Sequence, residues 1–340
     1  MTTTSTKRGR GMGAAAPVAA LMVLSPMLAE LPSGAMRPTD FLSPMIFFPF
    51  TIVVYGLPVL ALREIAARLG LGATGLWVLG MVYGVFNEGL FSETFYYPLE
   101  SSLPEFAGYG LVGDLQVPWM TYILPWHGLF SVLLPVMVVD RLFPRRSGRP
   151  WFSAKTTVVL TAVTAALGLA RFILNGEDIT VHSGSVFAFH LAVLCLLAAA
   201  LSVAAVRLPR TPRMTPGQDG RARLWRSFAV GAGLYAAGFL GMVFLASAGA
   251  PWLLPVAYGV AAVLAVVWAS TRVREVKRST VLAFTLGCLA LEAAVIPLFV
   301  QGILAGDAQS LATGAVVAAA AAFAMVRLGG RSGLSARTAL

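Results

Sequence analysis

Ten apolar blocks, each about 20 residues long, follow one another along the chain with only short breaks between them. They cover approximately residues 12–30, 42–62, 73–93, 118–140, 153–174, 185–206, 227–248, 250–270, 279–300 and 308–327. About 20 consecutive apolar residues are what an α-helix needs to cross a bilayer. Hydrophobic residues make up 58% of the 340 residues and charged residues only 12%, which is too apolar for a soluble domain. The sequence therefore predicts an all-α, polytopic membrane bundle of about ten helices.

Lysine and arginine gather in every second connection between the blocks. The clusters lie at residues 7–10, 63–68, 141–149, 207–226, 272–278 and 327–337. Short basic connections mark the cytoplasmic side, so we expect both termini to be cytoplasmic and the protein to be a multi-pass protein of the cell membrane. The net charge of +10 is spread over these connections instead of forming one basic patch. We therefore expect a lipid bilayer, and no nucleic acid, as its surroundings.

The polar residues within the blocks are unevenly distributed. We divide the chain into a tail (1–11), a six-span half with most of these residues (12–206), a basic loop (207–226), a four-span half rich in Ala, Val and Gly (227–327) and a second tail (328–340). The first block, after a basic start, could alternatively be a cleaved signal peptide. The longest outer connection, about 94–117, could fold over the outer surface as a cap.

Glu88 is the first candidate for a catalytic residue. It lies in "FNEGLFSETFYY", deep in the third block, where an ionisable group costs about 2.5–3.5 kcal/mol. Gly84 and Gly89 would let a helix or a ligand approach it closely. Alternatively, Glu88 only forms a hydrogen bond to a neighbouring helix. Glu93, nearer the surface, is expected to be solvated.

His127 is the second candidate. It lies near the middle of the fourth block, directly after a kink expected at Pro125, and Ser131 follows one turn later on the same face. At a depth similar to that of Glu88, it could transfer a proton or contact a substrate. A hydrogen bond between helices is the structural alternative.

Six further residues are predicted to bind a hydrophobic small-molecule substrate. They are Trp119, Tyr122, Trp126 and Phe130, which form an aromatic stripe, together with Phe91 and Arg171. Aromatic faces stabilise cations, although such stripes also occur as ordinary packing. Arg171 could pair with Glu177 or Asp178, or bind an anionic headgroup or diphosphate.

The remaining polar residues in the blocks have simpler interpretations. Glu292 is expected to be protonated, or paired with His190 or His127, and His182 to be exposed in a loop. Cys195 and Cys288 are expected to be unreactive buried thiols. No metal-binding spacing, nucleotide-binding motif or GxSxG motif occurs, so we expect no metal and no cofactor.

Four stretches together resemble a group of uncharacterised multi-pass bacterial membrane proteins, over about residues 24–151. They are "SPMLAELPSG", "VYGLPVLALREIAARLG", "GMVYGVFNEGL" and "WHGLFSVLLPVMVVDRLFP". Glu30, Glu64, Glu88 and His127 match the pattern of this group, and Asn87 stands where the group has a first glutamate. The resemblance implies the membrane fold and no activity. The chain is also weakly similar to the CAAX-processing glutamic intramembrane proteases, but it lacks their second carboxylate and their arginine.

Three classes of function follow from these residues. The first is a membrane enzyme that acts on a lipid-soluble substrate by proton transfer, with Glu88 as the acid and His127 as the base or hydrogen-bond partner. Its most concrete form is a terpenoid cyclase. The second is an intramembrane protease or hydrolase. The third is a secondary transporter in which Glu88, His127 and Glu292 relay protons. The concentration of polar residues in the first six blocks favours the enzyme.

Overall fold

The computed structural model describes residues 14–96, 104–175, 185–208 and 213–330, and these are almost entirely helical. The helices are α1 (Ala15–Glu30), α2 (Pro38–Phe41), α3 (Pro44–Pro49), η1 (Phe50–Val54), α4 (Gly56–Leu69), α5 (Ala73–Phe86), η2 (Asn87–Phe91), η3 (Pro104–Phe106), α6 (Val117–His127), η4 (Gly128–Leu133), α7 (Leu134–Leu142), α8 (Ala154–Asn175), α9 (Ser185–Arg207), α10 (Arg221–Ser247), α11 (Leu253–Thr271), α12 (Arg278–Ala293), η6 (Ala294–Leu304) and α13 (Ala308–Gly330). The strands are β1 (Leu111–Val112), β2 (Leu115–Gln116), β3 (Arg213–Thr215) and β4 (Glu275–Lys277). The all-α membrane fold is thereby confirmed.

Eight helical stretches of the described residues are long and apolar enough to cross a membrane. They are Pro44–Leu69, Val117–Leu142, Ala154–Leu174, Ala188–Arg207, Arg221–Ser247, Leu253–Thr271, Arg278–Leu304 and Ala308–Leu328. The prediction of ten is corrected at two blocks. The first forms α1, which has only 16 residues, and the third forms α5 and η2, an apolar helix whose last turn contains Asn87 and Glu88.

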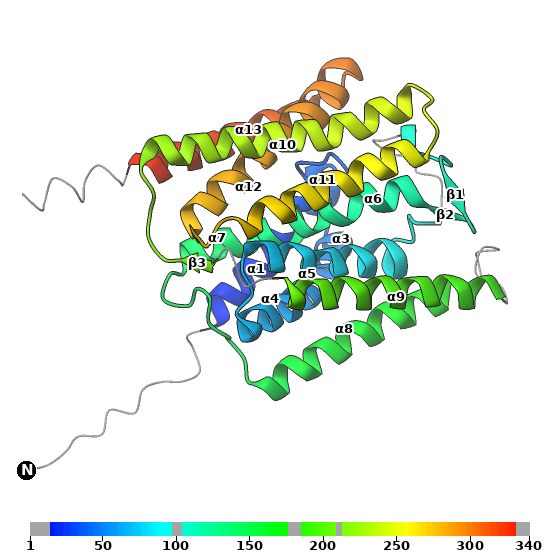
Figure 1. Cartoon of the computed structure of the whole chain (residues 1–340), viewed down its shortest axis with the longest axis horizontal. Helices are drawn as coiled ribbons and strands as arrows, with labels where there is room; N and C mark the ends of the chain where they lie inside the picture. Colours follow the sequence, from blue (N-terminus) through cyan, green and yellow to red (C-terminus); the bar gives the residue numbers. More distant parts are fainter. Residues whose placement is uncertain (1–13, 97–103, 176–184, 209–212, 331–340) are drawn as a thin grey trace, which may run out of the picture.

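The span from Val117 to Leu142 lies at the centre of the bundle. Figure 1 shows α8 and α9 along one edge and α10 and α13 along the opposite edge, with α5 and α6 between them. In the most apolar stretch of this central span, 83% of the residues are buried. In the corresponding stretch of Leu253–Thr271, only 11% are buried. Peripheral helices therefore turn most of their apolar surface outward, as lipid-facing helices do, and the central span is surrounded by protein.

Helix α1 is an integral part of this bundle. Leu21 and Ala29 are fully buried, and the Ser25 hydroxyl donates a 2.6 Å hydrogen bond to the Ser131 carbonyl in η4. The helix packs against α4, α7 and η4. Residues 15–30 thus complete the core next to the central span.

The described part of the outer connection covers one end of the bundle. Strands β1 and β2 form an antiparallel hairpin directly before α6. Phe106 is fully buried and stacks on Tyr122, with 5.8 Å between ring centroids, while the Tyr109 hydroxyl donates to the Ala250 carbonyl between α10 and α11. The connection therefore packs on the ends of α6, α10 and α11, as a cap would.

At the other end, two basic connections are joined to each other. Strand β3, before α10, pairs in parallel with β4, before α12. In Figure 1, β3 and the end of α7 lie at the same end of the bundle as the start of α1 and the end of α13. This placement agrees with the predicted alternation of basic connections, and the orientation in the membrane stays a prediction.

Candidate functional site

Glu88 and His127 meet inside the bundle. Oε1 of Glu88 lies 2.5 Å from Nε2 of His127, and the two residues are only 6% and 2% exposed. The side-chain amide of Asn87 donates a 3.1 Å hydrogen bond to the same carboxylate oxygen. The structure therefore brings the two predicted catalytic residues together, with the amide of Asn87 beside them.

Small residues make this close approach possible. A Cβ at Gly80 would lie 2.8 Å from Cα of Gly128, and one at Gly84 would lie 3.3 Å from Cβ of His127. Backbones approach this closely only where no side chain separates them. The glycines of α5 thus bring η2 and α6 within hydrogen-bonding distance.

Ser131 extends the pair to a chain of three groups. Its Oγ lies 2.8 Å from Nδ1 of His127, on the opposite side of the imidazole from Glu88. If Nε2 of His127 donates to the Glu88 carboxylate, Nδ1 accepts a hydrogen bond from the Ser131 hydroxyl. A carboxylate, an imidazole and a hydroxyl are then linked in one line, which is an arrangement that can move a proton.

The second carboxylate oxygen of Glu88, Oε2, is bound by a residue of the outer connection. The Thr94 hydroxyl donates to Oε2 of Glu88, and Nε1 of Trp119 donates a 2.9 Å hydrogen bond to the same hydroxyl. The Gln116 side chain donates a 2.9 Å hydrogen bond to the Thr94 carbonyl. Trp119 is predicted to bind substrate. In the structure it positions Thr94, which in turn orients Glu88.

A second polar cluster lies around Glu292. Trp126 Nε1 donates to Oε1 of Glu292 at 3.1 Å, and the Tyr235 hydroxyl donates to Oε2 at 2.5 Å. The predicted pairing of Glu292 with a histidine is wrong, because α12 packs on α10 and η4, and His190 instead lies 2.9 Å from the Gly113 carbonyl. Two buried carboxylates thus lie next to α6, one bound through His127 and the other through Trp126.

The aromatic stripe of α6 packs against other rings. All four of its residues, Trp119, Tyr122, Trp126 and Phe130, are at most 7% exposed. Trp126 meets the His127 ring edge-on at 4.9 Å, Tyr122 lies 5.2 Å from Phe239, and Phe130 lies 5.4 Å from Tyr235. A substrate-binding role for these rings stays a prediction.

Phe91 and Arg171 lie together at the outer end of α8. The Arg171 guanidinium is 5.9 Å from the centroid of the Phe91 ring. Glu177, Asp178 and His182 lie outside the described residues.

The prediction that Glu93 is solvated is wrong, since this residue is only 2% exposed. It lies in a turn that folds back, so that the amide of Phe95 donates to the Glu88 carbonyl.

Four π-helical segments (η1, η2, η4 and η6) adjoin these polar clusters. The sequence did not reveal these segments. Glu88 lies in η2, Ser131 lies in η4, and Glu292 lies two residues before η6. Tyr55 directly follows η1 and donates to Glu30. Such widened turns are rare and occur frequently at functional sites.

The Glu30–Tyr55 pair is close to the histidine. The ring of Tyr55 lies 5.2 Å from that of Tyr83, and the ring of Tyr83 lies 5.2 Å from that of His127. Only the family pattern around Glu30 pointed to this residue. The pair adds a third carboxylate, that of the partly buried Glu30, to the region around His127.

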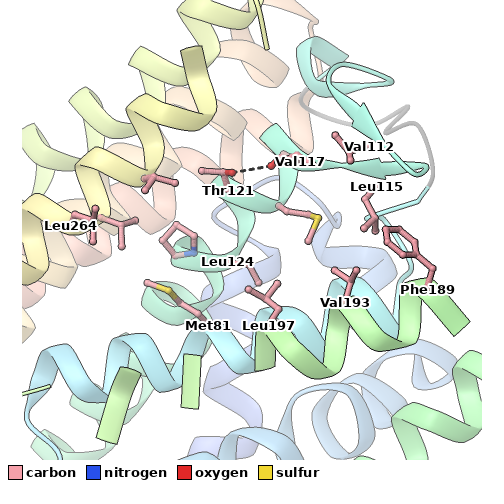
Figure 2. A pocket seen from close by; sticks show the side chains of 14 residues that line it. Met81, Val112, Leu115, Val117, Thr121, Leu124, Phe189, Val193, Leu197 and Leu264 are labelled. Atoms are coloured by element: carbon pink, nitrogen blue, oxygen red, sulfur yellow. Dashed lines mark hydrogen bonds between the residues drawn. The ribbon is translucent and has the colours of Figure 1, made fainter. Parts of the chain in front are cut away.

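An apolar cavity among the described residues lies beside this network. It has a volume of about 470 Å³ and opens between α5, α6, α9 and α11 (Figure 2). Figure 2 shows Val193 and Leu197 of α9 across the cavity from Leu264 of α11. Its lining is mostly aliphatic, with Phe189 as its aromatic residue. Thr121, its single polar residue, donates its hydroxyl to the Val117 carbonyl at 2.9 Å.

None of the predicted site residues lines the cavity, but its wall adjoins them. Met81 lines the cavity and lies three residues before Gly84, which packs against His127. Leu124 also lines it and lies three residues before His127 itself. Residues three apart on a helix are neighbours. The apolar cavity therefore lies about one turn from His127 along α6 and about two turns from Glu88, which follows α5 in η2.

Neither cysteine adjoins the Glu88–His127 pair in the contacts of the described residues. Cys288 is buried, and its thiol donates to the Gly231 carbonyl at 3.3 Å, whereas Cys195 is exposed, contrary to expectation. Within the described ranges, no three His, Cys, Asp or Glu side chains are arranged to bind a metal ion.

The fold and the buried polar network define a multi-pass helical membrane protein with ionisable groups at its centre. The chain belongs to an uncharacterized membrane protein family, whose sequence profile matches residues 19–327. This confirms the resemblance to uncharacterised membrane proteins and extends it over most of the chain. Comparisons with curated proteins and with solved structures gave no match, and the similarity to CAAX-processing proteases has no support in them.

Proposed function

We propose that the protein is a membrane enzyme that transfers a proton to or from a lipid-soluble substrate, with Glu88 and His127 as its acid–base pair. The observation that supports this most is the 2.5 Å contact between their side chains, both nearly excluded from solvent. Ionisable groups within a bilayer are costly and generally functional. General acid–base groups need a positioned partner of this kind.

The adjacent cavity supports a substrate with an aliphatic chain. Its lining is almost entirely aliphatic, and it lies between helices that turn apolar surface outward. A chain could enter from the lipid and lie against Met81 and Leu124, one turn from Gly84 and His127. A small shift of α5 relative to α6 would then connect the cavity to the imidazole.

The structure gives the terpenoid cyclase no specific support. A cyclisation that passes through a carbocation needs aromatic faces next to the substrate. The rings of the α6 stripe contact other rings, and Phe189 is the one aromatic residue in the cavity lining. The proposal is therefore limited to proton transfer on a chain-bearing substrate.

A second candidate, a proton-coupled transporter, is favoured by one further observation. The adjacent residues Trp126 and His127 bind two different buried carboxylates, Glu292 and Glu88, and their rings meet edge-on. Carboxylates on either side of one helix could pass protons between two helix layers. The intramembrane protease is disfavoured, because Asn87 provides an amide where a second carboxylate would activate water.

Lipid and metabolite profiling of a host that expresses the wild type, Glu88→Gln or His127→Ala tests the proposal. We expect a lipid-soluble product with the wild type and a loss of about 100-fold or more with either variant. Glu275→Gln, in exposed β4, is the matched control and should retain the product. If both variants retain it, the proposed site is wrong. If the wild type changes proton flux in vesicles while no lipid is converted, the transporter is correct and the enzyme is not.

A further inference from the structure

A second, polar cavity lies at the basic end of the bundle, and none of the residues of the Glu88 network lines it. It has a volume of about 270 Å³ and is formed by the end of α7, the connection after it, the connection before α10 and the start of α12. Its polar lining residues are Asp140, Arg141, Ser147, Gln218, Arg278 and Ser279. Two arginines and one aspartate give this lining a net charge of +1.

Three of these residues have buried polar atoms that the described protein leaves without a hydrogen bond. They are Oγ of Ser147, Nε2 of Gln218 and Nε of Arg278, all of which can donate. Nε of Arg278 lies 3.3 Å from Oδ2 of Asp140, which is an ion pair without hydrogen-bond geometry. Buried donors without acceptors are costly, and three around one cavity can donate together to a bound ligand.

The donors are held in place by neighbouring contacts. Lys277 donates a 2.9 Å hydrogen bond to the Gln218 carbonyl, and a Cβ at Gly148 would lie 2.3 Å from Nη2 of Arg278. Gly148 has a φ of 64°, which glycine adopts without strain, so the connection passes directly against the guanidinium. The cavity is thus a built site and not a gap between loops.

Arg141 supplies the charge that an anion needs. No salt bridge of Arg141 is formed within the described residues, whereas Arg278 is paired with Asp140. The start of α12 adds its helix dipole, and Lys277 at its N-cap provides no side-chain cap. Asp219, close to this helix end, is already bound by Lys277 and Arg223, so its charge is compensated.

We propose that this cavity binds the phosphate group of an anionic ligand through Arg141, Arg278, Ser147 and Gln218. Phosphate oxygens accept several hydrogen bonds and match an arginine fork. The cavity lies at the end of the bundle predicted to face the cytoplasm, where both anionic headgroups and free phosphate occur. The inference does not depend on the function proposed for Glu88.

Binding of two probes to the purified full chain tests this site. Inorganic phosphate is compared with chloride at equal ionic strength by the thermal unfolding midpoint. Phosphatidic acid is compared with diacylglycerol, which has the same chains without the phosphate, by native mass spectrometry of retained lipid. Arg141→Gln should weaken binding about tenfold, because it removes a charged hydrogen bond, and Ser147→Ala should weaken it several-fold. Neither residue makes a contact that the fold needs, so both variants should fold.

Arg145→Gln is the matched control, since Arg145 is an exposed arginine of the same connection that does not line the cavity. Stabilisation by phosphate alone would identify free phosphate as the ligand, and selective retention of phosphatidic acid would identify a headgroup. Either result supports the site if binding of the probe is lost with Arg141→Gln and retained with Arg145→Gln. Binding of neither probe, or equal loss with the two arginine variants, overturns it.

Discussion

His127 contacts Glu88 with one ring nitrogen and Ser131 with the other, so a single imidazole joins η2 to η4. The carboxylate also accepts from Asn87 and Thr94. Every polar side-chain atom of this buried pair therefore has a hydrogen-bonding partner. Its contribution to stability can be measured separately from any activity.

A double-mutant cycle measures the coupling of the two residues. Glu88→Ala should lower the free energy of unfolding by about 3 kcal/mol, since it leaves buried donors without an acceptor. Glu88→Gln should cost less, because it keeps an acceptor oxygen. With His127→Ala as the second change, we expect an interaction energy of about 1–3 kcal/mol. Additive effects of the two changes would show that the contact does not form.

The Glu292 cluster predicts a difference between two tyrosines. Tyr235→Phe removes a 2.5 Å donor to a buried carboxylate and should lower stability by about 1.5–3 kcal/mol. Tyr258→Phe also removes a hydroxyl, but Tyr258 is 38% exposed, and the loss should be smaller. Thermal unfolding in one detergent compares the two variants. Similar losses would argue against the cluster around Glu292.

Glu64 is expected to hold the connection between α7 and α8. It is fully buried, contacts Arg63 at 2.5 Å and accepts hydrogen bonds from the amides of Trp151 and Phe152. Glu64→Gln should lower the free energy of unfolding by about 3 kcal/mol, because it leaves the buried Arg63 without its counter-charge. It should also expose this connection to limited proteolysis. A variant as stable and as resistant as the wild type would contradict the assignment.

Two helical glycines should respond in opposite ways to alanine. A Cβ at Gly80 would lie 2.8 Å from Cα of Gly128, so Gly80→Ala should separate α5 from η4 and destabilise the protein by about 1–3 kcal/mol. Gly233 in α10 has nothing within 4 Å of such a Cβ, and Gly233→Ala should be neutral or stabilising by up to about 1 kcal/mol. Unfolding midpoints compare the two, and a destabilising Gly233→Ala would argue against the packing described.

The pH dependence of stability should report on Asp219. Burial raises the pKa of this carboxyl, but hydrogen bonds from Thr280 and Lys277 and the charges of Lys277 and Arg223 outweigh it, so the pKa lies below 3.8. A carboxyl with a pKa lower in the folded than in the unfolded state stabilises the fold above the unfolded pKa. This contribution is lost as the pH falls through the folded pKa.

Asp219→Asn should therefore be less stable than the wild type near neutral pH, and the difference should shrink from about pH 4 downward. Unfolding midpoints over a pH series measure it. Asp40→Asn, at an exposed position, serves as the control and should show a smaller difference. A constant gap between Asp219→Asn and wild type down to the lowest pH would rule out the proposed charge effect.

The sequence predicted the helical membrane fold and the meeting of Glu88 with His127, because apolar length and the depth of a charged group are local properties. It could not predict the partner of Glu292, since this depends on which faces of α6, α10 and α12 meet. Glu93 was placed in solvent because its position at the end of a block does not show the turn that buries it. The widened turns have no sequence signature that sets them apart from an α-helix.

The widened turn η4 also has a consequence for the basic end of the bundle. Its hydrogen bonds take in one residue more than those of an α-helix, and each added residue turns the following helix by about 100° about its axis. The segment thus contributes to the rotation at which α7 presents Asp140 to Arg278. A relative that lacked one residue of Gly128–Leu133 would keep the apolar span but rotate Asp140 out of phase with α12. The length of this segment, not only its composition, is thus part of what specifies the protein.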